Sequence, residues 1–181
     1  MLSNKKKIYV LLAPKFSDLA YEIFENLKND FSELSVNGIV SGERKIYHQA
    51  KKKFDNIVYL EDIEKKIVKA DYNLEKIEKF RKIFGDKVIN NIIISDRHIG
   101  QGYVSGAIQF QSKLRELVQI NNTLPVILAI ELLDYFLNEF EKLKPDLVFI
   151  YALAGGSTLA MAEVAKYLNI STIRFYNTRK P

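Results

Sequence analysis

Three ionisable side chains stand next to each other in the segment 95–103, beside two glycines. Asp96, Arg97 and His98 are consecutive, and the glycines follow within four residues. A histidine can act as a general base near neutral pH, and a guanidinium can clamp an anionic group. We therefore treat His98 and Asp96 as candidate catalytic residues and Arg97 as a candidate ligand-binding residue. The structural alternative is that Asp96 and Arg97 pair and cap nearby backbone, with His98 simply exposed.

A second segment of interest is a small-residue turn that opens a helical pattern over Leu159–Leu168. It reads Gly155-Gly156-Ser157-Thr158. Two glycines let a backbone approach a ligand closely, and the N–H groups and positive dipole end of the new helix attract an anion. These four residues are candidate ligand-binding residues for a phosphate or carboxylate. Alternatively, the glycines only form a tight turn, and Ser157 or Thr158 caps the helix.

Several cofactor motifs are missing from the sequence. The first apolar run is followed by Ala-Pro-Lys-Phe-Ser-Asp, so the glycine fingerprint of dinucleotide-binding proteins is absent, as are a P-loop and a GxSxG elbow. Only two histidines are present, far apart, and there is no cysteine, so no metal site is predicted. We expect no cofactor in this chain and place His48, which lies among lysines, on the surface.

Apolar runs that alternate with helical patterns predict the elements that position these residues. The expected strands are Lys7–Ala13, Leu34–Val40, Asn56–Leu60, Leu147–Ala152 and Ile170–Tyr176. The expected helices are one that begins near Ser17, then Glu43–Lys53, Glu61–Ala70, Asn73–Phe84, Ser105–Ile120, Pro125–Leu143 and Leu159–Leu168. The run Val88–Ser95 fits a strand or a helix, and we favour helix or irregular structure. This order is typical of a Rossmann-like three-layer α/β domain with a mainly parallel sheet of about five strands, in the order 3-2-1-4-5.

The strand order predicts where a ligand binds. Ligands gather at the carboxyl ends of parallel strands where the order reverses, here between Lys7–Ala13 and Leu147–Ala152. The loops after these two strands border that crevice, and the segment near Arg179 is expected close by. Lys15, Ser17 and Arg179 therefore join the candidate ligand-binding residues.

Composition is that of a globular protein, with 48% hydrophobic and 27% charged residues over a chain of 181. This balance predicts one domain over residues 1–181. The absence of cysteine excludes thiol catalysis and disulfides. We identify neither a signal peptide nor a membrane span, and expect a soluble, cytoplasmic protein. The net charge is +5, with basic residues spread along the chain, which is typical of a solvated surface. The alternative is attraction to anionic lipid, as in peripheral membrane association. No nucleic-acid partner is expected.

Several segments, which together cover most of the chain, resemble a known family. The run Lys144–Phe149, the turn Gly155–Thr158, and the segments Ala162–Leu168 and Ile170–Phe175 are similar to the unit near the end of the N-terminal Rossmann-like domain of GT-B glycosyltransferases. The Asp96-Arg97-His98 segment is similar to a "DR" segment in capsular and surface-polysaccharide biosynthesis proteins of that type.

This resemblance implies transfer of a sugar from a nucleotide-sugar to a growing surface glycan. The N-terminal domain of such enzymes mainly holds the acceptor, here a glycan or lipid-linked acceptor. The nucleotide-sugar donor binds mainly to a second Rossmann-like domain, and this sequence stops where the connection to it is expected. We therefore expect a second α/β donor-binding domain or subunit as partner, and no turnover by this chain alone. The alternatives are a non-catalytic Rossmann-like binding or scaffolding module that recruits a partner, and a free-standing small-molecule-binding protein.

Overall fold

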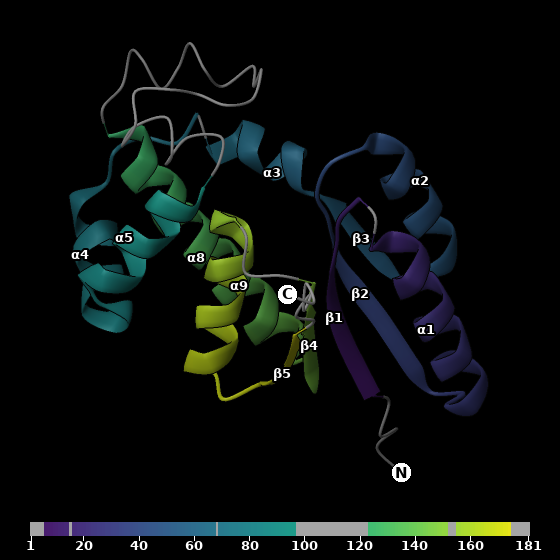
Figure 1. The fold of residues 1–181 in the computed structure, drawn as a ribbon. Coiled ribbons are helices and arrows are strands. Elements are labelled where there is room, and N and C mark those ends of the chain that lie inside the picture. Colours follow the sequence, from purple (N-terminus) through teal and green to yellow (C-terminus); the bar gives the residue numbers. More distant parts are fainter. Residues whose placement is uncertain (1–5, 15, 68, 97–122, 152–154, 175–181) are drawn as a thin grey trace, which may run out of the picture. The chain divides into compact units, whose positions relative to one another are not determined.

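The computed structural model of the chain describes residues 6–14, 16–67, 69–96, 123–151 and 155–174 (Figure 1). These residues belong to two compact units. The first, here called the sheet unit, comprises Met1–Ile63, Leu143–Ala152 and Asn169–Pro181. The second, the helical unit, comprises Glu64–Lys142 and Leu153–Leu168.

The sheet unit is built on five parallel strands. They are β1 (Lys6–Leu12), β2 (Leu34–Val40), β3 (Asn56–Tyr59), β4 (Leu147–Ile150) and β5 (Ser171–Arg174). Their order is β3-β2-β1-β4-β5, and every neighbouring pair is parallel. The predicted fold class and strand order are confirmed, and this is an α/β Rossmann-like fold. β4 ends two residues earlier than the apolar run predicted, and residues 175–176 of the last predicted strand lie outside the described residues.

The central strands β1 and β2 are mainly apolar, with Ser35 and Asn37 as buried polar residues of β2. Almost every residue in them is buried, as expected for the middle of a parallel sheet. Gly38 of β2 pairs with Val10 of β1, and a Cβ atom on Gly38 would lie 2.1 Å from the carbonyl oxygen of Val10. Only glycine therefore fits this position in the sheet.

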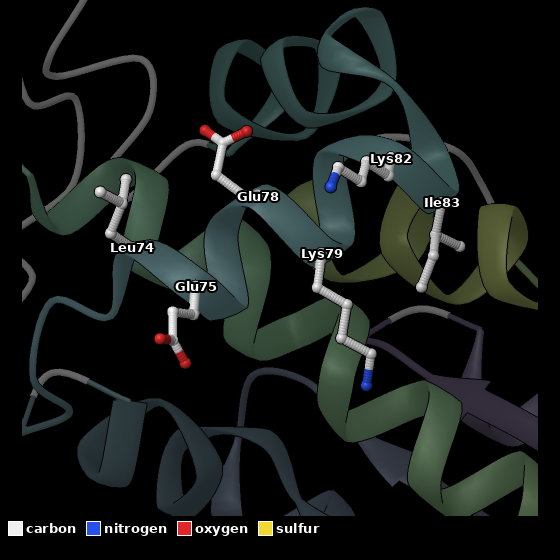
Figure 2. Close-up of a pocket in the computed structure, with 6 residues that line it drawn as sticks. All are labelled: Leu74, Glu75, Glu78, Lys79, Lys82 and Ile83. Atoms are coloured by element: carbon white, nitrogen blue, oxygen red, sulfur yellow. The ribbon is translucent and has the colours of Figure 1, made fainter.

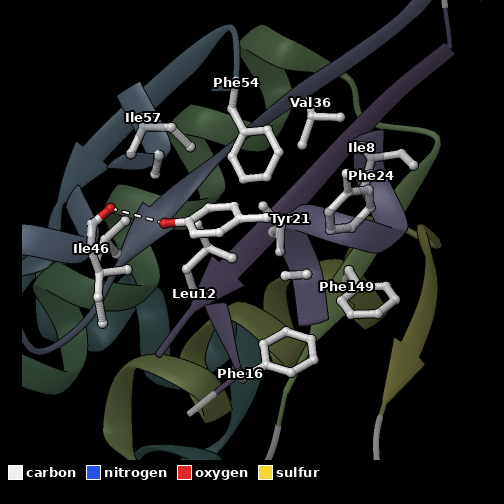
Figure 3. Close-up of a cluster of buried hydrophobic side chains, with 14 of the residues drawn as sticks. Ile8, Leu12, Phe16, Tyr21, Phe24, Val36, Ile46, Phe54, Ile57 and Phe149 are labelled. Carbon is white, nitrogen blue, oxygen red and sulfur yellow. Dashed lines mark hydrogen bonds between the residues drawn. The ribbon is translucent and has the colours of Figure 1, made fainter. Parts of the chain in front are cut away.

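One face of the sheet packs against α1 (Ser17–Asp30) and α2 (Arg44–Lys53). Figure 3 shows the aromatic rings that fill this layer. The ring of Phe24 lies edge-on to Phe54 and to Phe149, at centroid distances of 5.8 and 5.3 Å. The buried Tyr21 hydroxyl donates to the carbonyl of Ile46 at 3.0 Å, which ties α1 to α2. His48 is exposed on α2, as predicted.

The helical unit contains α4 (Leu74–Phe84), α5 (Asp86–Ser95), α8 (Leu124–Leu143) and α9 (Gly156–Tyr167). α3 (Leu60–Ile67) follows β3 directly and runs across the boundary between the units. The ambiguous run over 88–95 is part of helix α5. Its buried residues Ile89, Ile92 and Ile93 recur at helical spacing.

Two helices differ from the sequence prediction. α8 was expected to bury a single stripe, but it also buries Leu128, Leu132 and Phe136, while Val126 of the predicted stripe is only partly buried. α9 begins at Gly156, three residues before the predicted start at Leu159. The helix predicted at Ser105–Ile120 lies outside the described residues. Within the described part of the chain, no helix is both long and apolar enough to cross a membrane.

Candidate functional site

The first turn of α9 is closed by a side chain that reaches back to the residue before the helix. The hydroxyl of Thr158 accepts from the N–H of Gly155 at 3.1 Å and donates to the carbonyl of Gly155 at 2.8 Å. In a capping box, the side chain of the third helical residue bonds to the N–H of the residue before the helix, whose own side chain bonds back. Thr158 makes the first of these contacts, and Gly155 has no side chain to make the second. Thr158 is buried. The Thr158 hydroxyl thus caps the helix, which is the structural alternative to ligand binding at this turn.

Asp96 lies against this turn. It is the residue at the end of α5, and its N–H donates to the carbonyl of Ile92 at 3.0 Å. A Cβ atom on Gly156 would lie 3.1 Å from both the Cβ and the Oδ2 atom of Asp96, and 3.2 Å from the carbonyl oxygen of Ile92. Glycine at position 156 therefore allows the end of α5 to contact the start of α9. Two of the segments singled out in the sequence meet here, although they are far apart along the chain.

The charge of Asp96 suits this position. Only 7% of the residue is exposed, and its carboxylate stands at the N-terminal end of α9, where the helix dipole is positive. A phosphate bound at the same turn would meet the charge of Asp96, and like charges repel strongly where water is excluded. The turn is therefore better suited to a polar or hydrogen-bonding ligand group than to an unaccompanied anion.

In the sheet unit, the strand order reverses between β1 and β4, as predicted. Ser17 is buried at the start of α1, and its N–H and that of Phe16 both donate to the carbonyl of Ala13, at 3.1 and 3.2 Å. The Phe16 ring stacks on Tyr151, with centroids 4.8 Å apart. Aromatic rings therefore fill the carboxyl end of β1 and β4 on the side of the sheet that α1 covers.

Three residues at the carboxyl ends of the strands were not among the predicted site residues: Phe16, Tyr151 and Arg174. Arg174 is the last described residue of β5, and its Nε atom is buried with no hydrogen-bond partner among the described residues. A buried polar atom of this kind is uncommon and calls for a partner such as an anion or water. The available signal was an arginine within the apolar run Ile170–Tyr176. For Phe16 it was a large ring where dinucleotide-binding proteins carry glycine.

An open hollow lies along α4, but it carries none of the predicted residues. It is lined by Leu74, Glu75, Glu78, Lys79, Lys82 and Ile83 (Figure 2). Each glutamate there is followed four residues later by a lysine, Glu75 by Lys79 and Glu78 by Lys82, an arrangement that supports an exposed helix face. The balanced charge of this lining offers no preference for an ionic ligand.

The structure brings together Asp96 and the residues 155–158 in the helical unit, and Ser17 belongs to the sheet unit. Lys15, Arg97, His98 and Arg179 lie outside the described residues. Among the residues that the structure describes, no group of three or more His, Asp or Glu side chains is placed to hold a metal ion.

The parallel sheet and its order define the class of this chain as an α/β protein of Rossmann-like fold. No protein-family model matches the chain, and neither does any curated protein. Among solved structures, it is similar to one described as the crystal structure of UDP-N-acetylglucosamine 2-epimerase, with 13% sequence identity and a TM-score of 0.45. The match covers 94% of this chain and 33% of that chain, so this chain spans about a third of that protein's length. A likeness of this degree carries no information about activity.

Proposed function

We propose that the chain is the acceptor-side domain of a glycosyltransferase-like protein of capsular or surface polysaccharide biosynthesis. It works in the cytoplasm with a second α/β domain or subunit that binds the nucleotide-sugar donor. The proposal rests on the residues that resemble GT-B glycosyltransferases, and one observation carries it furthest. Asp96 of the "DR" segment lies against Gly156 of the glycine turn, so two separate parts of the resemblance belong to one place in the helical unit.

The proposal assigns a different role to each group. Asp96 is buried between α5 and α9, so it is a positioning residue that fixes where the following residues leave α5. His98 takes the proton from the acceptor hydroxyl as that oxygen bonds to the sugar and the nucleotide leaves. Of the remaining candidates, Arg97, Gly155, Gly156 and Ser157 of the helical unit hold the acceptor, while Thr158 caps α9.

Amide NMR of the full chain tests which ligand it binds. The probes are a short-chain prenyl-pyrophosphate monosaccharide as acceptor mimic, and UDP-N-acetylglucosamine as donor. We expect the acceptor mimic to shift the amides of Asp96, Gly155 and Ser157 saturably, and the donor to leave them unchanged. Donor binding at these amides, with no response to the acceptor mimic, would contradict the proposal. So would sustained sugar transfer by the chain alone.

The alternative is a non-catalytic module that recruits a catalytic partner. The observation that favours it is the closed first turn of α9, where Thr158 and Asp96 already serve structural ends. The double substitution Arg97→Ala and His98→Ala separates the two functions. In the presence of the donor-binding subunit, the acceptor-side domain loses transfer activity with these changes, whereas a recruiting module keeps it.

A further inference from the structure

Two neighbouring helices on the surface of the sheet unit carry opposite charge. α1 and α2 lie side by side on the same face of the sheet (Figure 1). α1 contains four acidic residues and one lysine, a net charge of −3. α2 contains five basic residues and no acidic residue, a net charge of +5. The face that they present to solvent is therefore divided into an acidic and a basic half.

Pairing within one copy of the chain uses only some of these charges. Lys53 of α2 lies 2.6 Å from Glu25 of α1, and Arg44 lies 3.6 Å from Asp62. Three acids of α1 and three lysines of α2 make no ion pair with any described residue, and all six are exposed: Asp18, Glu22, Asp30, Lys45, Lys51 and Lys52. The surplus charges on the two helices are thus matched in number and opposite in sign.

The acidic half also exposes two large apolar side chains. Leu19, near the start of α1, is 47% exposed, and Phe31, just after its end, is 58% exposed. They are separated by about 18 Å along the helix, at 1.5 Å per residue. Apolar anchors among charged residues resemble the make-up of a protein–protein interface more than that of an ordinary solvated face.

We propose that this face, α1 together with α2, binds a second copy of the same chain. A twofold axis parallel to the helices places α1 of one protomer against α2 of its partner, and repeats the contact on the other side. The acidic half of each protomer then faces the basic half of the other. This inference stands independently of the proposed function.

The positions of the charges along the helices fit that arrangement. Both helices follow strands of the same parallel sheet, so both start at its carboxyl edge and run in the same direction. Asp18 and Lys45 are each the second residue of their helix, while Glu22 is the sixth and Lys51 the eighth. At 1.5 Å per residue, Glu22 and Lys51 differ by about 3 Å in height, within reach of a long side chain. The expected contacts are Asp18 with Lys45 and Glu22 with Lys51.

An anionic membrane or a nucleic acid is a poorer partner for the same face. Such a polyanion would be attracted to α2, but the three unpaired acids of α1 lie beside it and would repel it. A second copy satisfies both halves together. The charge pattern therefore favours self-association over binding to a polyanion.

Sedimentation equilibrium of the full chain tests the proposal with charge reversals. We expect a dimer that weakens as ionic strength rises from about 0.05 M to about 0.5 M, because exposed charges are screened. Glu22→Lys and Lys51→Glu should each raise the dimer dissociation constant about tenfold or more, since each puts like charges together. The double variant should restore it to within about threefold of the wild type. Glu75→Lys, on the exposed surface of α4, is the control and should change nothing.

Three results would overturn the inference. The first is a wild-type chain that stays monomeric at every concentration tested. The second is a dimer whose dissociation constant does not respond to the reversals, or is not restored in the double variant. The third is a monomer that binds vesicles of phosphatidylglycerol and loses that binding in Lys51→Glu. Thermal unfolding of each variant confirms that the reversals leave the fold intact.

Discussion

Asp146 and Lys7 hold each other through two hydrogen bonds. The Oδ2 atom of Asp146 accepts from the N–H of Lys7 at 2.8 Å, and the N–H of Asp146 donates to the carbonyl of Lys7, also at 2.8 Å. Lys6 adds an ion pair to the Oδ1 atom at 3.3 Å. Because Asp146 directly precedes β4, these contacts fix the start of β4 beside β1. The aspartate of the Lys-Pro-Asp run thus has a structural task, whatever its resemblance to glycosyltransferases implies.

Replacing Asp146 should lower stability in a pH-dependent way. The N–H of Lys7, and then Lys6, hold the pKa of Asp146 below its ordinary value of 3.8. A lowered folded-state pKa adds stability that is present above the unfolded-state pKa and lost as pH falls through the folded-state pKa. We expect Asp146→Asn to cost about 1 kcal/mol at neutral pH, less than a buried hydrogen bond to a charged group, because the Asp146 side chain is 43% exposed and solvent screens it. The difference in free energy of unfolding between wild type and variant, measured with urea, should disappear well below pH 3.8. An equal difference at neutral pH and at that low pH would contradict this account.

Gly38→Ala should be severely destabilising. The added Cβ atom would lie 2.1 Å from the carbonyl oxygen of Val10, in the middle of a strand pair that cannot separate locally. We expect a loss of more than about 3 kcal/mol, or no folded protein, as for other severe steric conflicts in a core. Gly155→Ala is the matched control, because its φ of −160° suits any residue and nothing lies within 4 Å of the new atom. Similar losses in circular dichroism melts of the two variants would refute the steric explanation.

The contact of Asp96 with Gly156 predicts coupling between the two positions. Gly156→Ala places a methyl group 3.1 Å from the Asp96 side chain and should cost about 1–2 kcal/mol. Asp96→Ala removes Oδ2 and relieves part of that conflict, so the double variant should be more stable than the sum of the single changes predicts. A coupling of about 0.5 kcal/mol or more in a double-mutant cycle is expected for residues in contact. Strict additivity would show that the two side chains do not touch in solution.

Local pattern was enough to predict much of the fold. β1 contains a continuous apolar run, β2 is mainly apolar, and the alternation of strands with helices predicted the parallel sheet. The early start of α9 was missed because it depends on Thr158 bonding back to Gly155, which apolar spacing does not record. The contact of Asp96 with Gly156 could not be predicted either, since only folding brings α5 and α9 together.

At the carboxyl ends of the strands, too, the sequence predicted the strand order but not the contacts that form on folding. Strand order correctly located the reversal between β1 and β4. It did not indicate that Phe16 and Tyr151 would stack there, because ring stacking depends on side-chain directions at the ends of two different strands. The burial of the Nε atom of Arg174 likewise follows from tertiary packing and not from any local pattern.

Lys76 should be the strongest ionic link among the described residues of the helical unit. Its Nζ atom lies 2.6 Å from Glu131 and 2.7 Å from Asp134, and all three side chains are less than a third exposed. Burial alone lowers the pKa of Lys76, but hydrogen bonds to Asp134 and Glu131 outweigh it, so the net pKa is raised above 10.5. A raised pKa means that the stabilisation is complete below the unfolded-state pKa and is lost as pH rises through the folded-state pKa.

Lys76→Met should therefore cost about 1–3 kcal/mol near neutral pH, because it leaves two carboxylates facing each other without their shared cation. The loss, measured by urea unfolding, should stay constant across neutral pH and shrink only once pH exceeds the raised pKa of Lys76. Lys79→Met on the same helix is the control, since Lys79 is exposed and has no ion pair among the described residues. It should change stability by less than about 0.5 kcal/mol. Equal losses for the two variants would mean that α4 is held to α8 by its apolar contacts and that the ion pairs contribute nothing.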